Sequence, residues 1–222
     1  MYFNKNNNFF HGIMFHHFHD DGFHKKSQGS INKDDFYKML NFIGRNNILD
    51  ADIFFEKLKN KKLKETEVCI TFDDALKCQI DIALPVLEEL KIKSFFFVYT
   101  SVFEEKPDNL EIFRYFRVNY FNDIKEFYNS FYKVLDKDLK NFFDENIDKI
   151  MSSKKKFPFY SIEDIKFRLV RDNFLNKTEY EEIMFLMIKE KNLNYKETYK
   201  KLFFQKDDLK KIDNLGHLVG LH

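Results

Sequence analysis

Short runs of consecutive apolar residues interrupt an otherwise polar first hundred positions, and such runs predict buried strands. They lie at 12–15, 68–72 and 94–99. The second run is rich in β-branched residues, which favour strands. Between the second and third runs, residues 76–90 have helical periodicity, with Pro85 at a helix start or kink. The order strand, helix, strand predicts a parallel βαβ unit.

Two further helices are predicted between the first and second strands. Phe36, Leu40 and Ile43 follow helical spacing, and Ser30 is the predicted N-cap before them. Gly44 is the predicted end of this helix, since glycine is common just after a helix C-terminus. A second short helix is expected over about 50–58.

The pattern changes after position 103, where strand-like runs cease and helical spacing prevails up to 212. Phe113, Phe116 and Tyr120 share one helical face, and Thr178 with Glu181 forms a predicted capping box. The last residues, 216–222, read as a loop entering another short strand. The chain is therefore predicted to consist of an α/β part (1–103), a helical insertion (104–212) and a return to the α/β part (213–222).

Composition narrows the function more than the fold. The chain holds 37 Lys and Arg against 36 Asp and Glu, a net charge of +1, so no nucleic-acid or acidic-lipid partner is expected. The 29 Phe and 11 Tyr, beside no Trp, are interpreted mainly as core residues. We found no internal repeat.

The cellular compartment is predicted from the small number of cysteines and from the lack of a signal peptide or membrane-spanning segment. Cys69 and Cys78 are too few for a disulfide framework and are interpreted as buried thiols in a reducing compartment. The first residues lack the apolar run of a signal peptide, and no stretch is apolar enough for a transmembrane helix. A cytoplasmic protein is the expectation.

Candidate chemistry lies at the end of the second strand, where Asp73 and Asp74 follow directly. Ligands bind at the carboxyl edge of parallel sheets, where the loops open. Two adjacent carboxylates that point in different directions can divide the work, one holding a metal and the other a proton. The alternative is structural, with the pair serving as the N-cap and first-turn acid of the following helix.

The surrounding residues favour the catalytic interpretation. Thr71-Phe72-Asp73-Asp74, the Leu84-Pro85 step and the Phe-rich run 94–98 resemble the polysaccharide deacetylases of the NodB-homology family. In that family the Thr-Phe-Asp-Asp motif is usually followed by Gly, and here Ala75 stands in its place. Residues 12–16 resemble the family's early strand, and 216–222 resemble the approach to its second, His-containing motif. The resemblance covers about 10–31, 66–103 and 213–222, leaving the helical middle outside it.

This resemblance implies a partial, distorted (β/α) barrel with a large helical insertion, and it implies site residues. Asp73 matches the general base that activates water, and Asp74 and His222 match ligands of a divalent metal, most commonly zinc. Such a metal lowers the pKa of bound water and polarises the acetamide carbonyl. The implied reaction removes N-acetyl groups from a carbohydrate, either a surface polysaccharide or its precursor.

Histidines supply the remaining candidates. His16 ends the first strand and is assigned to the substrate side of the site. His16 with His19, or His17 with one of the acids at 20 and 21, are alternative metal ligands. The sequence stops at His222, before the family's second metal-binding His and its later motifs. We therefore expect an N-terminal portion of the family's fold, with an incomplete metal site.

Two other functions remain open at this point. The chain could be a catalytically inactive remnant or a non-catalytic carbohydrate-binding module. Alternatively, the helical block could be an interaction module with the β part as its scaffold. Acetate release, bound metal and partner binding distinguish the three.

Overall fold

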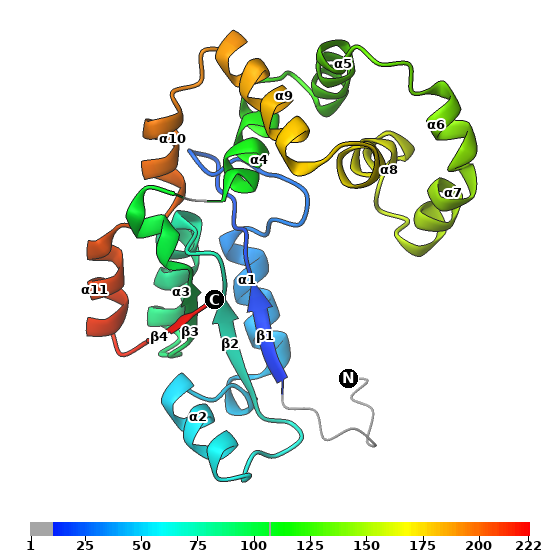
Figure 1. The fold of residues 1–222 in the computed structure, drawn as a ribbon. Helices are drawn as coiled ribbons and strands as arrows, with labels where there is room; N and C mark the ends of the chain where they lie inside the picture. The colour runs from blue at the N-terminus through cyan, green and yellow to red at the C-terminus, as the bar shows by residue number, and fades with distance from the viewer. Residues whose placement is uncertain (1–10, 107) are drawn as a thin grey trace. The chain divides into compact units, whose positions relative to one another are not determined.

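Four parallel strands form one sheet in the described part of the chain, residues 11–106 and 108–222 of this computed structural model (Figure 1). In spatial order they are β1 (His11–Phe15), β2 (Val68–Phe72), β3 (Phe95–Val98) and β4 (Leu218–Leu221). The predicted strands and the α/β class are confirmed. Among the described residues β1 and β4 are the edges of the sheet and do not pair with each other. The barrel stays a prediction.

The strand register brings three candidate residues to one edge. Phe15 lies opposite Phe72, so β1 and β2 end side by side, and Phe72 lies opposite Phe96, two residues before the end of β3. Val98 lies opposite Leu221 at the end of β4. His16, Asp73 and His222 are each the first residue after a strand, and all four strands run parallel. Their positions therefore share the carboxyl edge of the sheet.

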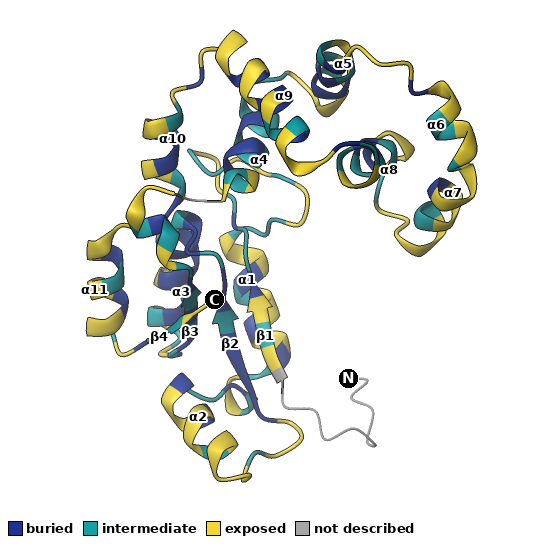
Figure 2. Cartoon of the chain, in the orientation of Figure 1, coloured by how far each residue is buried: buried dark blue, intermediate teal, exposed yellow. Residues whose placement is uncertain are grey.

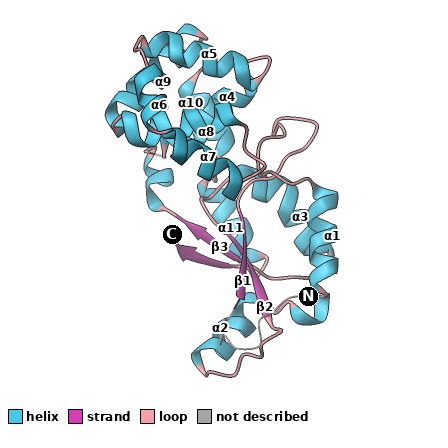
Figure 3. Ribbon diagram, turned by 90° about the vertical axis from the view of Figure 1, so that its right-hand side faces the viewer, coloured by secondary structure: helices cyan, strands magenta, loops and turns pink. Residues whose placement is uncertain are grey.

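Phenylalanine fills the layer between this sheet and its helices. The ring of Phe36, fully buried, meets Phe15 and Phe18 edge-on at centroid distances of 4.9 and 5.1 Å. Phe72 stacks on Phe96 at 4.7 Å. Figure 3 shows α1 (Lys33–Ile43) and α3 (Leu84–Glu89) on the same side of the sheet. Figure 2 shows exposed residues along α1, whereas α3 is mostly buried or intermediate. Among the described residues, 13 of 26 Phe are buried, and others such as Phe42 and Phe159 are exposed, so the core interpretation holds for only about half of them.

The helix boundaries correct two local expectations in this part. Asn32, and not Ser30, caps α1, because its side chain accepts a hydrogen bond from the Asp35 amide. Ser30 Oγ is used inside the preceding loop, donating to Ser27 O and lying 2.9 Å from His19 Nδ1. Gly44, with φ of 88°, ends α1 as predicted.

The expected helix over 76–90 is present in two pieces. It contains the π-helical turn η2 (Gln79–Ala83) followed by α3, which has Pro85 in its first turn. A shorter helix, α2 (Ala51–Lys59), agrees with the prediction. The 3-10 turns η1 (Arg45–Asn47) and η3 (Thr100–Glu104) lie in connections.

The chain forms two compact units. Unit 1 comprises the described residues of 1–108 with 196–222, and unit 2 comprises 109–195. Unit 2 is shorter than the helical block 104–212, because α10 (Tyr195–Leu202) and α11 (Lys206–Asn214) lead back to the sheet. Between them Phe203 is fully buried, and the Phe204 amide donates to Ala75 O. The segment between α10 and α11 thus supports Ala75, the residue that follows Asp74.

Unit 2 is wholly helical in its described residues. Its elements are α4 (Asn109–Asn119), α5 (Ile124–Leu135), α6 (Lys140–Glu145), α7 (Ile147–Lys156), α8 (Ile162–Leu169), the π-helical turn η4 (Val170–Phe174) and α9 (Lys177–Glu190). The predicted capping box is displaced by two positions, since Asn176 and Glu179 form it. Phe127, Phe131 and Phe167 are fully buried. The Tyr195 hydroxyl donates to Asn109 Oδ1 over 2.7 Å and joins the two ends of the unit.

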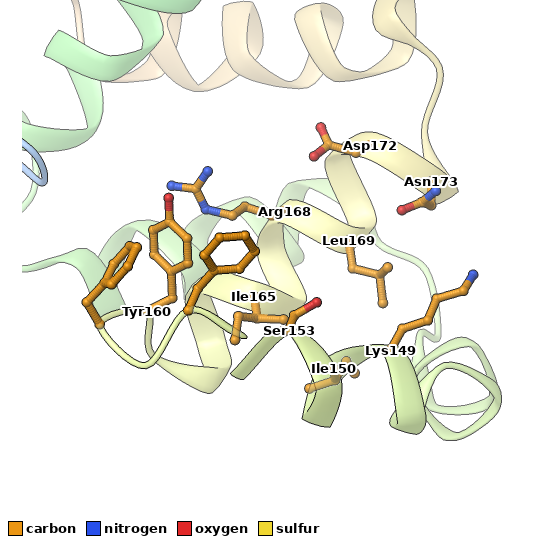
Figure 4. A pocket seen from close by; sticks show the side chains of 11 residues that line it. Lys149, Ile150, Ser153, Tyr160, Ile165, Arg168, Leu169, Asp172 and Asn173 are labelled. Atoms are coloured by element: carbon orange, nitrogen blue, oxygen red, sulfur yellow. The ribbon is translucent and has the colours of Figure 1, made fainter. Parts of the chain in front are cut away.

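A pocket of about 390 Å³ lies within unit 2 (Figure 4). Phe157, Phe159 and Tyr160 are among the residues that line it, and Arg168 stacks over the Tyr160 ring at 4.3 Å. Arg168 also donates to Asp164 from the same helix. The lining shares no residue with the carboxyl edge of the sheet.

The two thiols agree with the sequence interpretation. Cys69 and Cys78 are both buried and unbridged, and burial raises the pKa of Cys69 to about 12, which keeps its thiol protonated and unreactive. Among the described helices, none has both the length and the apolar character needed to cross a bilayer. The cytoplasmic location stays a prediction.

Candidate active site

Two carboxylates and two imidazoles meet at the carboxyl edge of the sheet. His222 Nε2 lies 3.5 Å from Asp73 Oδ2 and 4.0 Å from Asp74 Oδ1. His16 Nε2 lies 3.6 Å from Asp74 Oδ2 and 4.0 Å from Asp73 Oδ2. Each imidazole therefore reaches both carboxylates. The structure brings together all four residues that the sequence selected.

The backbone hydrogen bonds between neighbouring strands continue to the first residue after β2 and after β4. The Asp73 amide donates to Phe15 O, and the His222 amide donates to Val98 O over 2.9 Å. These bonds fix the main chain under two of the candidate side chains. The strands run parallel, so the residues that follow β1, β2 and β4 lie at the same edge of the sheet, although β3 and β4 run two residues further than β1 and β2.

The turn after β2 is conformationally unusual. Asp74 and Ala75 have positive φ values of 73° and 52°, in the left-handed region that side chains rarely adopt. Such strain persists only where surrounding contacts impose it, and it clusters at functional sites. Here Ala75 is buried and its carbonyl accepts the Phe204 amide. The left-handed conformation explains why glycine suits this position, which the resemblance to deacetylases had indicated.

Exposure differs among the four side chains in a way that separates their roles. The Asp73 side chain is 10% exposed, whereas those of Asp74, His16 and His222 are 26%, 32% and 47% exposed. Asp73 is thus sheltered from bulk water at the back of the cluster. The other three can meet a ligand that arrives from solvent.

The donor types in the cluster, imidazole nitrogen and carboxylate oxygen, are ones that zinc accepts. Zinc takes imidazole nitrogen and carboxylate oxygen at about 2.0–2.2 Å in a tetrahedron, which puts neighbouring ligand atoms about 3.4 Å apart. The nitrogen-to-oxygen distances of 3.5 to 4.0 Å between the His and Asp side chains fit pairs of such ligands. Among the described residues, no three His, Cys, Asp or Glu side chains are already arranged around one point. The donor chemistry fits, while a complete three-residue metal cage is not preformed.

The other histidines of the N-terminal tract have separate contacts. His17 stacks on the His16 ring at 5.9 Å. His19 pairs with Ser30, and Asp20 Oδ1 accepts two amides of its own loop. His24 lies 2.9 Å from Asp81 and ties this loop to η2. Of the alternatives considered for metal binding, His16 is the member that the structure places at the cluster.

His217 is structural. It is 1% exposed, its Nδ1 accepts the Ser94 amide, and its Nε2 lies 3.1 Å from Glu88 Oε1. Burial lowers the pKa of His217, and this effect outweighs the hydrogen bond to Glu88, which raises it. A neutral ring that accepts at one nitrogen and donates at the other satisfies both partners. His217 thereby fixes the start of β4.

Gly220 has a packing role two residues before His222. A Cβ atom added there would lie 2.6 and 2.7 Å from two ring carbons of Phe97. Phe97 in turn stacks on Phe95 at 5.7 Å with the rings nearly parallel. Glycine at this position lets β4 pass close to the aromatic face.

Sequence reasoning missed Gln79. It is fully buried, and its amide nitrogen donates to His16 O and Asp73 O over 3.0 and 2.6 Å. The available signal was a lone amide in a mainly apolar stretch, 75–87, whose other polar residues are Lys77 and Asp81. A polar residue at such a position is easily assigned to the exposed face of the helix.

Comparison with known proteins supports the resemblance over part of the chain. Residues 60–115 match the family model described as polysaccharide deacetylase, a segment that includes Asp73 and Asp74. Among solved structures, the Streptococcus pyogenes deacetylase PplD in complex with acetate matches with 20% identity and a TM-score of 0.35. The match covers 49% of this chain and 52% of that one, so the chain spans about half the length of that structure. Comparison with curated proteins gives no significant match.

Proposed function

We propose that this chain, similar to polysaccharide deacetylases over residues 60–115, is a metal-dependent hydrolase that removes N-acetyl groups from a carbohydrate. One observation carries the proposal. His222 lies far along the sequence from the Asp73-Asp74 motif, yet its imidazole is 3.5 Å from the Asp73 carboxylate. A structural N-cap pair would not account for two imidazoles directed at the same carboxylates.

Asp73 is assigned as the general base. Its side chain is the most sheltered of the four. The Asp73 backbone is held on both sides, because its amide donates to Phe15 O and its carbonyl accepts from Gln79 Nε2. A positioned carboxylate of this kind can take a proton from an attacking water. Water oxygen then bonds to the acetamide carbon, the carbon–nitrogen bond breaks, and the proton passes to the departing amine. Acetate and a free sugar amine are the products.

Asp74 and His222 are assigned as metal ligands. Asp74 Oδ1 and His222 Nε2 are 4.0 Å apart, and both side chains are accessible. A divalent ion bound there, most simply zinc, would supply a Lewis acid for the acetamide oxygen and a lower pKa for water. His16, a third exposed and 3.6 Å from Asp74, is assigned to the substrate side, where its ring can hydrogen-bond the acetamide or a neighbouring hydroxyl.

The test measures acetate release from N-acetylated sugar oligomers with zinc or cobalt present. Asp73→Asn should reduce the rate by about 100-fold or more, the usual contribution of a positioned acid or base. Asp52→Asn, an exposed aspartate in α2, is the matched control and should leave the rate unchanged. Thermal unfolding of each variant verifies folding. Equal rates for wild type and Asp73→Asn would contradict the assignment.

A second candidate is a carbohydrate-binding protein without catalysis. It is favoured by the observation that no three potential ligands surround one point among the described residues. Metal analysis separates the two functions. Stoichiometric zinc in the purified protein that is lost in Asp74→Asn supports the hydrolase, whereas sugar binding without metal supports the second candidate.

A further inference from the structure

We propose that Gln79 is a positioning residue, which sets the spacing between the main chain of His16 and that of Asp73 and so aligns the site. The functional part of this inference rests on the proposed hydrolase activity. Gln79 touches no reacting atom. It acts through the two strand ends that carry a substrate-side imidazole and the general base.

The hydrogen bonds of Gln79 define this role. Its Nε2 donates to His16 O over 3.0 Å and to Asp73 O over 2.6 Å. Both partners are carbonyl oxygens, which only accept, so the amide nitrogen must be the atom that faces them. One side chain thereby bridges the segments that follow β1 and β2, beyond the last ladder bond between these strands at Asp73.

Energetics argue against a purely structural reason for an amide here. Gln79 is fully buried, and within the described residues its Oε1 has no hydrogen-bond partner. Leaving a buried acceptor unpaired costs about as much free energy as the two donated hydrogen bonds return. A methionine of similar length would fill the space without that cost. The amide is therefore better explained by the geometry it imposes than by stability.

The local fold supports the same assignment. Gln79 begins the π-helical turn η2, and such turns occur frequently at functional sites. The preceding residue contacts the same loop, since Cys78 Sγ lies 3.4 Å from the Phe18 amide and 3.8 Å from His16 O. Two successive residues at this helix start thus hold the backbone that carries His16.

The experiment compares Gln79→Met with Ile82→Ala in the full chain. Ile82 lies in the same π-helical turn and is also buried. Its side chain is apolar, so it forms no hydrogen bond to His16 or Asp73. Its truncation should lower the unfolding midpoint by leaving a cavity in the core, so it reports what loss of stability alone does. Readouts are kcat and KM for acetate release, Co²⁺ affinity, and the visible spectrum of bound Co²⁺, all well below both unfolding midpoints.

We expect Gln79→Met to lower kcat or Co²⁺ affinity by about 10–100-fold, the range found when groups that orient ligands are removed, and to alter the cobalt spectrum. Ile82→Ala should retain wild-type values. Wild-type kcat, affinity and spectrum in Gln79→Met would overturn the inference, as would an equal loss in Ile82→Ala.

Amide hydrogen exchange keeps this test separate from that of the proposed function. If the wild-type protein neither binds Co²⁺ nor releases acetate, the hydrolase proposal fails, and exchange at the amides of Phe18 and Asp73 still decides the positioning role. Exchange there at least tenfold faster in Gln79→Met than in Ile82→Ala supports it. Equal exchange in the two variants overturns it.

Discussion

Substituting Gly220 by alanine tests whether close packing in β4 holds His222 at the site. The added Cβ would lie 2.6 and 2.7 Å from the Phe97 ring, against an ordinary carbon–carbon contact of about 3.5–4.0 Å. Either the ring or the strand must therefore move by roughly 1 Å. The ring is backed by Phe95, with which it stacks almost parallel. Displacement of the strand would carry His222, two residues further on, away from Asp73.

The magnitude follows from two opposing terms. Overpacking of this kind costs about 1–3 kcal/mol. Replacing glycine in a strand returns about 0.5–1 kcal/mol, because alanine loses less backbone entropy on folding. The net loss of unfolding free energy for Gly220→Ala then lies between about 0 and 2.5 kcal/mol, centred on about 1.25 kcal/mol. For a chain of this size the central value lowers the unfolding temperature by about 2.5–5 °C.

Gly12→Ala is the matched control on the opposite edge strand. Its added Cβ would meet Thr71 Cγ2 at 3.5 Å, an ordinary contact, so only the favourable entropy term applies. The assays are equilibrium denaturation and Co²⁺ titration. Gly220→Ala should lose both stability and Co²⁺ affinity, and Gly12→Ala neither. A Gly220→Ala protein that unfolds at or above the wild-type midpoint would refute the packing argument.

Three further predictions concern stability and are measured by denaturant unfolding. Phe36→Ala should cost about 3–5 kcal/mol, since its fully buried ring joins α1 to the aromatic layer on the sheet; a loss below 1 kcal/mol would contradict that placement. Tyr128→Phe should cost about 1.5–3 kcal/mol, because its hydroxyl donates to the buried Asp164 carboxylate over 2.8 Å, and the same change at the half-buried Tyr37 should cost much less. Stability should fall as the pH drops from 8 to 5, because burial lowers the pKa of His217 below its ordinary 6.5 and the unfolded chain then binds the extra proton. His217→Gln should flatten that part of the profile, and an unchanged slope would argue against a neutral, buried His217.

The strands were predictable because their signal is local. Val68–Phe72 is almost entirely buried, and a continuous apolar run is what such a strand requires. The position of Asp73 and Asp74 at its end followed directly. His16 and His222 were placed at the ends of other strands by the same reasoning. Their convergence depends on register, which the sequence supplies only through the resemblance to a known family.

Helix starts were less predictable, because competing caps differ by little free energy. Asn176-Lys-Thr-Glu179 and Thr178-Glu-Tyr-Glu181 both have capping-box spacing, and the structure uses the first. Ser30 and Asn32 compete in the same way, and the loop contact to His19 takes Ser30 out of that competition. Gln79 could not be identified from spacing, since its function depends on two carbonyl groups that only the fold brings together.

The hydrogen bond between Tyr195 and Asn109 has a consequence for the order of folding. About 120 residues separate β3 from β4, and unit 2 accounts for most of them, leaving about 30 outside it. Once unit 2 has formed, its joined ends act as a short connection, and closing the remaining loop costs about 1 kcal/mol less in chain entropy. The last strand and His222 can then dock against β3 across an effective connection of about 30 residues instead of about 120.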